Sequence, residues 1–156
     1  MSLASLQATL RGVRRLALDT SVVIAAGDAA DPRQACARWL LDAIERGRFT
    51  FTVISTLTVA EALVRAVTTS FEDGITVQTA LRNLPHLTIA PLDFDIAVEA
   101  AHIRGATKLK MPDAIVLATA VALEVEAIVH ADAEWVTKAG PFGGTLKLIY
   151  LGAHCP

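Results

Sequence analysis

Apolar residues fall along the chain in short runs that are separated by longer, helically spaced segments. The short runs are rich in β-branched and aromatic residues, which is typical of strands. They lie at residues 15–19 (RLALD), 49–55 (FTFTVIS), 86–92 (HLTIAPL), 127–132 (AIVHAD) and 145–151 (TLKLIYL). This pattern predicts a strand at each of these places.

The segments between these runs carry apolar residues at helical spacing. They are residues 20–27, 32–47, 56–70, 72–83, 93–107, 111–126 and 133–140. Asp31 and Pro32 form a helix-start signal with proline at the first helical position, and Gly47 marks the end of that helix. Ser55 or Thr56 is expected to cap the next helix.

Strands that alternate with helices predict an α/β fold, in which a largely parallel central sheet is flanked by helices. The length of 156 residues is that of one ordinary domain. We expect residues 15–156 to form this domain, preceded by a leader at residues 1–14. Three explanations of this leader are open: it is an extra helix, it results from an upstream start of translation, or part of it was added to the natural chain. Apolar residues recur in it at roughly helical spacing, at Leu3, Leu6, Leu10 and Val13.

Composition and charge limit the classes of function. Hydrophobic residues make up 53% of the chain, yet no apolar run reaches the roughly 20 residues of a membrane span. The longest candidate, residues 114–123, is followed by Glu124 and Glu126. The net charge of −2 argues against a broad basic surface that coats nucleic acid. Any contact with RNA or DNA must therefore be local or assisted by a bound cation.

The cysteines and the N-terminus indicate the compartment. Cys36 and Cys155 are far apart and show neither metal-binding spacing nor a disulfide framework. Arg11, Arg14 and Arg15 follow the first apolar positions instead of preceding them, so the N-terminus does not resemble a signal peptide. We expect a cytoplasmic protein with reduced cysteines and no membrane association.

Acidic residues stand at the ends of the predicted elements. Asp19 ends the first strand, and Asp132 ends or follows the strand at 127–132. Asp113 lies in the first turn of the helix that leads into that strand. In a parallel sheet these ends meet at one edge, the edge where ligands bind. A fourth acid, Glu61, lies in an otherwise apolar helix.

A cluster of carboxylates repels itself unless protons or cations intervene. Oxygen ligands alone favour a hard divalent cation, Mg²⁺ or Mn²⁺. Such a cation activates water and stabilises a leaving oxygen, which is the chemistry of phosphodiester hydrolysis. The acids therefore predict metal-assisted hydrolysis.

Each acid also has a local explanation. Asp19 and Asp132 are suited to capping the helices that follow them, and Asp113 complements a helix dipole. Glu61 has Arg65 four residues later, a favourable helical pair on a polar, solvated face. Residues that served only to cap separate helices, however, would not have to lie at the same edge of the sheet.

These residues resemble the blocks of the PIN domain family over about residues 15–150. LALDTSVVIAA is similar to the opening block, STLTVAEAL to the second, PDAIVLATAVAL to the third and AIVHADAEW to the fourth. The fourth block departs from the family pattern, because His130 and Ala131 stand where Thr or Ser and then Asn are common. A compact chain of this size most resembles VapC-like toxins of toxin–antitoxin pairs.

The resemblance implies site residues, a cofactor and partners. Asp19, Glu61, Asp113 and Asp132 would form an acidic quartet that holds Mg²⁺ or Mn²⁺, with Asp19 and Asp113 as direct ligands. Ser21 would support Asp19. The implied activity is endoribonuclease action on an RNA substrate, in a homodimer neutralised by a small antitoxin. We expect the antitoxin to insert a basic C-terminal segment near Asp19 and Asp113.

His130 is interpreted separately, as a residue that tunes activity. It stands two residues before Asp132 on a short strand, so both side chains are expected on the same side. Nearby acids would favour its imidazolium form, and a bound cation would oppose it. The alternative is a packed or capped histidine at a strand end.

Other functions remain open. A housekeeping nuclease of the same family would carry the same quartet, and a non-catalytic binding domain would have kept the fold without the reaction. A phosphatase or dehalogenase would use Asp19 as a nucleophile, but such enzymes usually place a second acid where this chain has Ser21.

Overall fold

A five-stranded sheet lies at the centre of the computed structural model, which describes residues 2–140, 144 and 146–155. Its strands are β1 (Arg15–Leu18), β2 (Phe51–Ser55), β3 (Leu87–Ala90), β4 (Ala127–His130) and β5 (Lys147–Tyr150). Their order is β3-β2-β1-β4-β5, and every neighbouring pair is parallel. The predicted parallel α/β fold is confirmed. Thr145, at the predicted start of the last strand, lies outside the described residues.

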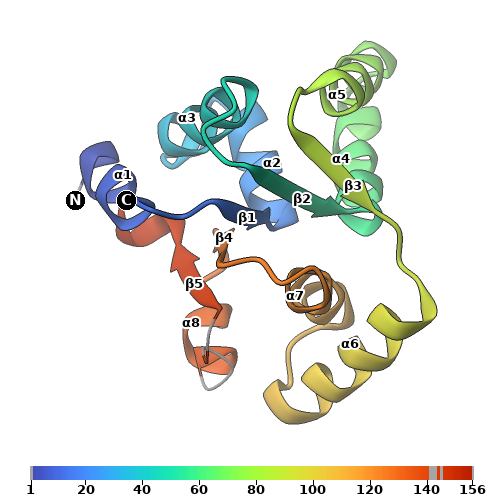
Figure 1. The fold of residues 1–156 in the computed structure, drawn as a ribbon. Helices are drawn as coiled ribbons and strands as arrows, with labels where there is room; N and C mark the ends of the chain where they lie inside the picture. Colours follow the sequence, from blue (N-terminus) through green and yellow to red (C-terminus); the bar gives the residue numbers. More distant parts are fainter. Residues whose placement is uncertain (1, 141–143, 145, 156) are drawn as a thin grey trace.

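Helices cover both faces of the sheet (Figure 1). They are α1 (Leu3–Thr9), α2 (Thr20–Gly27), α3 (Gln34–Glu45), α4 (Thr56–Thr69), α5 (Phe71–Asn83), α6 (Phe94–Thr107), α7 (Met111–Ala122) and α8 (Glu134–Lys138), with a 3₁₀ turn η2 (Leu151–Ala153) near the C-terminus. In Figure 1, α2, α3, α4 and α5 lie above the sheet, and α6, α7 and α8 lie below it. No helix in the described ranges is long and apolar enough to cross a bilayer.

The strands alternate between the two hydrophobic cores because successive side chains point to opposite faces. Leu16 and Leu18 of β1 pack with α2 and α3, whereas Ala17 between them packs with α6 and α7. Ile54 and Val53 of β2 divide in the same way. A sheet buried on both faces explains the almost continuous apolar runs of the strands.

Helix α3 begins later than Asp31 and Pro32 predicted. The Asp31 carboxylate accepts the backbone N–H of Arg33, two residues later, at 2.8 Å, and it also pairs with the Arg33 guanidinium at 2.7 Å. This local turn places Pro32 outside the helix, which begins at Gln34. At the other end Gly47 follows the helix with a φ of 68°, a conformation that favours glycine.

Leader residues form helix α1, and its buried Leu6, together with Leu10 directly after the helix, belongs to the core beside α2 and α3. The two ends of the chain lie close together (Figure 1). Ser5 Oγ is 2.9 Å from Nδ1 of His154, which joins α1 to the C-terminal turn.

The expectation of reduced cysteines is wrong in this structure, because Cys36 and Cys155 form a disulfide. Their Cα atoms are 6.3 Å apart, within the usual range for such a bond. The pairing arises because η2 brings the C-terminus against α3, although 119 residues separate the two cysteines in sequence.

Candidate functional site

The carboxyl edge of the sheet gathers the predicted acids. Asp19 directly follows β1 and is the N-cap of α2, and its backbone N–H donates to the carbonyl of Val129 in β4 at 2.9 Å. Since β1 and β4 are parallel neighbours, Asp132, two residues past β4, lies at the same edge. Asp113 lies in the first turn of α7, the helix that leads into β4. Three acids from distant parts of the sequence are therefore brought together.

Ser21 holds Asp19 and joins the two strand ends. Its backbone N–H donates to Oδ2 of Asp19 at 3.0 Å, and its hydroxyl donates to the same oxygen. The hydroxyl also accepts the backbone N–H of Ala131 at 2.8 Å. The predicted support of Asp19 by Ser21 is thus present in the geometry.

Glu61 faces the N-terminus of α2 and does not pair with Arg65. The hydroxyl of Thr20 donates to Oε2 of Glu61 at 2.6 Å and lies 3.1 Å from Oγ1 of Thr58, which is fully buried. Arg65 instead forms an ion pair with Asp28 at 2.8 Å. The local explanation of Glu61 as the partner of Arg65 is therefore wrong, and Thr20 is a site residue to which the sequence pattern assigned no role.

The electrostatics show that the acids influence one another. Burial, and then the negative charges of Asp19 and Asp132, raise the pKa of Asp113 from 3.8 to about 6. Burial also raises the pKa of Asp19, whose side chain is almost wholly buried, and the charge of Glu61 contributes in the same direction. The hydrogen bonds from Ser21 oppose this rise because they stabilise the charged form. A cation at this edge would relieve the repulsion.

Arg33 is a neighbour of the site that the sequence did not indicate. Its guanidinium pairs with Asp31 and donates to the carbonyl of Ala131, one residue before Asp132. The nearby charge of Asp132 also helps to raise the pKa of Arg33, after the larger contribution of Asp31. No spacing rule links residues almost a hundred positions apart, so only the fold reveals this contact.

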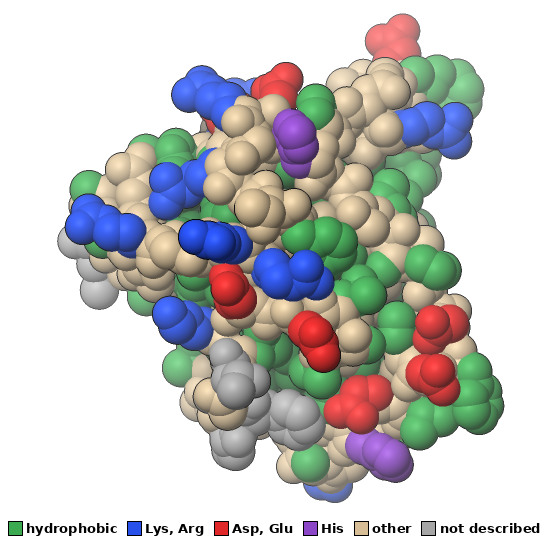
Figure 2. Space-filling view, in the orientation of Figure 1, with side chains coloured by type: hydrophobic (Ala, Val, Ile, Leu, Met, Phe, Trp, Pro, Cys, Tyr) green, Lys and Arg blue, Asp and Glu red, His purple; other side chains and the backbone are tan. Residues whose placement is uncertain are grey.

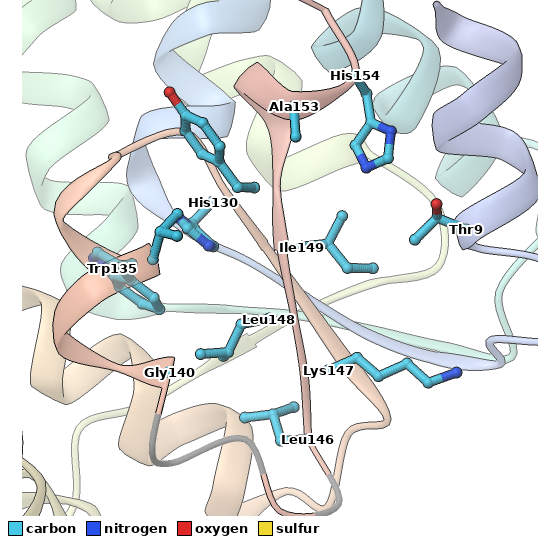
Figure 3. A pocket seen from close by; sticks show the side chains of 12 residues that line it. Thr9, His130, Trp135, Gly140, Leu146, Lys147, Leu148, Ile149, Ala153 and His154 are labelled. Carbon is cyan, nitrogen blue, oxygen red and sulfur yellow. The ribbon is translucent and has the colours of Figure 1, made fainter. Parts of the chain in front are cut away.

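His130 is a packed, neutral histidine, and the expectation of a favoured imidazolium is wrong. Its side chain is 1% exposed, and burial lowers its pKa from 6.5 to about 4. The ring stacks on Trp135 at 5.0 Å, beside strand β5 (Figure 3), and on Tyr150 at 5.6 Å. Nδ1 lies 2.9 Å from the backbone carbonyl of Asp132, so this nitrogen carries the hydrogen. The loss of hydration on burial lowers the pKa of His130 more than the negative charge of Asp132 raises it.

Several carboxylates are turned toward local donors. Asp19 accepts from Ser21, Glu61 accepts from Thr20, and Asp132 accepts the backbone N–H of Glu134 at 2.8 Å. No three His, Cys, Asp or Glu side chains in the described part of the chain form a ready-made metal-binding group. The capping explanation of Asp19 is correct, whereas the N-cap of α8 is Ala133 and Asp132 lies one residue before it.

The donor set nevertheless fits a hard divalent cation. Oδ2 of Asp113 is buried and has no hydrogen-bond partner, which is costly for a carboxylate. The surrounding acids, Asp19, Asp132 and Glu61, offer oxygen atoms alone, as Mg²⁺ and Mn²⁺ prefer.

The family model of the PIN domain matches residues 16–140, most of the chain and all of the acidic edge. This chain belongs to the PIN domain family. The match begins in β1 and ends just after α8, so every predicted site residue of this PIN domain falls inside it. Among curated proteins, no match reaches significance.

Solved structures with the same fold include proteins of toxin–antitoxin systems. A toxin–antitoxin complex from Klebsiella pneumoniae is similar at 23% identity and a TM-score of 0.64, over 87% of this chain and 97% of that chain. VapC20 of Mycobacterium tuberculosis, a toxin that cleaves the sarcin–ricin loop, matches at 16% identity and a TM-score of 0.65, over 78% and 92%. VapBC2 of Rickettsia felis, bound to a promoter DNA fragment, matches at 13% identity and 0.64, over 86% and 97%. At these low identities, the TM-scores show a shared fold.

Proposed function

We propose that this PIN domain is a divalent-cation-dependent endoribonuclease that hydrolyses RNA phosphodiesters and is the toxin of a toxin–antitoxin pair. The observation that carries the proposal is the acidic edge, where burial, and then the negative charges of Asp19 and Asp132, raise the pKa of Asp113 to about 6. Such a site is stabilised by a cation more than by any neutral ligand.

Asp19, Asp113 and Asp132 would hold the Mg²⁺ or Mn²⁺, with Glu61 acting directly or through a water. The cation, when bound, supplies an activated water and stabilises the leaving oxygen of the phosphodiester. Ser21 orients Asp19 and fixes it to the end of β4 through Ala131. Thr20 orients Glu61 by its hydroxyl. The chain itself thus supplies charge and orientation at one sheet edge.

Contact with RNA is expected to be local. On the face in Figure 2, most basic side chains gather over the left half and most acidic side chains over the lower right, so no continuous basic surface covers that face. This distribution agrees with the net charge of −2. A cation at the acidic edge would provide the positive charge that binds a phosphate.

Two competing functions make different predictions. An aspartate-nucleophile enzyme would need an accessible oxygen on Asp19, but Asp19 is 4% exposed and its Oδ2 accepts two donors from Ser21. A non-catalytic PIN domain would tolerate loss of Asp19 without a change in function. A housekeeping PIN nuclease would keep the metal-dependent cleavage but would lack a neutralising partner.

The partner of the proposed toxin would be a small antitoxin with an apolar helix and a basic C-terminal segment. A groove lies between α2 and α3 on one side and α4 and α5 on the other. Its lining includes Val23, Leu41, Ala66, Val77 and Ala80. Ala62 also lines it, one residue from Glu61, so a helix in the groove would deliver a basic tail to the acids. Arginine pairs well with such carboxylates.

A homodimer is also proposed, as expected for a chain this rich in hydrophobic residues. The β3–α6 patch consists of Ile89, Leu92, Phe94 and Val98. All four side chains are exposed, and Phe94 is 80% exposed. Large exposed apolar side chains that cluster in this way mark interaction surfaces. We assign the dimer contact to this patch.

The function is tested with purified protein and RNA. Wild type should cleave RNA in Mg²⁺ or Mn²⁺, lose the activity in EDTA and regain it when the cation is restored. In cells, expression of the chain alone should arrest growth, and co-expression with the neighbouring small open reading frame should restore it. Cleavage without growth arrest would support the housekeeping nuclease, and absence of metal-dependent cleavage would refute the proposal.

A further inference from the structure

Two polar atoms beside the acidic edge are buried without hydrogen-bond partners: Nε1 of Trp135 and Oδ2 of Asp113. The Trp135 side chain is fully buried, in the core that contains α6 and α7. An unpaired buried N–H destabilises the folded state, and an unpaired buried carboxylate oxygen does so at least as strongly. One atom is a donor and the other an acceptor, so each can satisfy the other.

Trp135 and Asp113 are neighbours, because the indole acts on the Asp113 carboxyl group, yet neither Nε1 nor Oδ2 has a hydrogen-bond partner. The indole N–H lowers the pKa of Asp113, against the larger rise caused by burial and by the charges of Asp19 and Asp132.

The indole is held in place by neighbouring rings. His130 stacks on Trp135 with an interplanar angle of 19°. Tyr150 of β5 in turn stacks on His130 with an interplanar angle of 29°. His130 is in turn fixed by its hydrogen bond to the backbone of Asp132. Trp135 is therefore restrained by a contact that reaches a second acid of the site.

We propose that Trp135 is a positioning residue, whose indole N–H holds Oδ2 of Asp113 so that the other carboxylate oxygen is directed to the divalent cation. This inference rests on the proposed function. Partners that hydrogen-bond a metal ligand orient it, and their removal typically lowers metal affinity by about 10- to 100-fold. A phenylalanine in the same place would fill the space and stack on His130, but it would lack the donor.

The first test compares the matched variants Trp135→Phe and Trp39→Phe in Mn²⁺ binding, measured by calorimetry on the full chain. Trp39 packs beside Arg48, in the opposite core from Trp135, so its loss removes an indole without touching the site. We expect Trp135→Phe to bind Mn²⁺ about tenfold more weakly and Trp39→Phe to bind like wild type. Equal affinity in wild type and both variants overturns the inference and leaves the proposed function standing. If wild type binds no Mn²⁺, both fail.

The second test does not depend on the folding of Trp135→Phe. In the Trp39→Phe variant, Trp135 supplies the single indole N–H signal in a ¹H–¹⁵N spectrum. We expect this signal to move on addition of Mg²⁺ and to remain still in the double variant Trp39→Phe with Asp113→Asn. A Mg²⁺-induced shift that persists without the Asp113 carboxylate, or no shift in Trp39→Phe at metal concentrations that saturate it, overturns the inference.

Discussion

The hydroxyl of Thr20 donates to Oε2 of Glu61 at 2.6 Å, across 41 residues of sequence and between two helices. Thr20 is the residue after Asp19, so one strand end orients two acids: Asp19 through Ser21, and Glu61 through Thr20. The Asp-Thr-Ser sequence therefore acts as a unit whose hydroxyl groups hold the acidic edge together.

Glu61→Gln should reduce RNA cleavage less than Asp19→Asn does. The amide keeps an oxygen that accepts from Thr20, and a helical residue can contribute through a water. We expect a loss of about tenfold for Glu61→Gln, within the range for removal of one supporting interaction. Initial cleavage rates at saturating Mg²⁺ measure the effect.

Arg65→Ala is the matched control for Glu61→Gln, because Arg65 pairs with Asp28 and not with Glu61. It should leave cleavage unchanged. A double-mutant cycle on the free energy of unfolding should show no coupling between Glu61 and Arg65. Coupling of 1 kcal/mol or more, taken as roughly the upper end for an exposed ion pair, would restore the local explanation of Glu61.

Asp19→Asn and Asp113→Asn should each abolish metal-dependent cleavage while the fold remains intact. Asparagine preserves the shape but lacks the charge that binds the cation. In EDTA, Asp113→Asn should also raise the melting temperature by about 2–4 °C, because it removes a carboxylate destabilised by burial and by its neighbours. Cleavage assays and calorimetry check the two effects. Wild-type cleavage by either variant would falsify the site assignment.

Two groups give the metal-free protein opposite responses to pH. The folded-state pKa of Asp113 is raised to about 6, so the folded protein binds a proton there that the unfolded chain does not, and stability rises as pH falls from 7 to 4. The pKa of His130 is lowered from 6.5 to about 4, so the unfolded chain binds the proton first, and stability falls over the same range. The wild-type response is the balance of these two groups with the other shifted groups, among them Asp19, whose raised pKa acts in the same direction as that of Asp113.

Single variants separate these contributions in EDTA. The stabilisation of Asp113→Asn relative to wild type should shrink as pH falls below 6, where Asp113 itself becomes neutral. The melting temperature of His130→Phe relative to wild type should rise as pH falls below 6.5, because the phenylalanine chain has no proton to gain on unfolding. A pH-independent difference for His130→Phe would show that the histidine is not held neutral.

Substitution in the groove should separate antitoxin binding from catalysis. Ala80 is exposed on α5 and lines the groove, whereas Gln78 is exposed on the same helix outside the lining. Ala80→Arg should block co-purification of the antitoxin and leave RNA cleavage unchanged, because a long charged side chain would occupy the groove. Gln78→Arg, the matched control, should bind normally. Normal binding by Ala80→Arg would place the partner elsewhere.

The β3–α6 patch should govern dimerisation. Phe94→Ser should shift the protein toward the monomer in sedimentation experiments, because an anchor in a dimer contact would be lost. Phe71 on α5 is 79% exposed, almost the same as Phe94 at 80%, and Phe71→Ser is the control that should remain dimeric. Dissociation in Phe71→Ser alone would assign the dimer to the α4–α5 hairpin.

The sheet and its acidic edge were predictable because they depend on regular patterns. Alternation of strands and helices implies parallel strands, and parallel strands bring Asp19, Asp113 and Asp132 to one edge whatever the loops do. The local explanation of Asp19 as a cap was correct as well. In this fold a helix start and a ligand site coincide, so the two readings do not compete.

Apart from the start of α3, the failed predictions concern contacts that local rules do not describe. The helical pairing rule suggested Arg65 for Glu61, but the true partner, Thr20, belongs to another helix. Strand alternation placed His130 beside Asp132, but Asp132 lies beyond the strand and the His130 ring packs against Trp135 instead. Contacts between distant segments depend on how whole elements pack. No regular spacing of residues along the sequence indicates which distant segments will meet.

The bond between Cys36 and Cys155 closes the chain into a covalent ring that contains Glu61, Asp113 and Asp132 and leaves Asp19 on a short arm outside it. A single backbone cut inside the ring therefore produces no separate fragments while the disulfide lasts. The two pieces stay one molecule of unchanged composition apart from one added water, and they part only when a thiol reductant opens the bond. A single cut inside the ring would therefore escape notice in gel electrophoresis without a reductant.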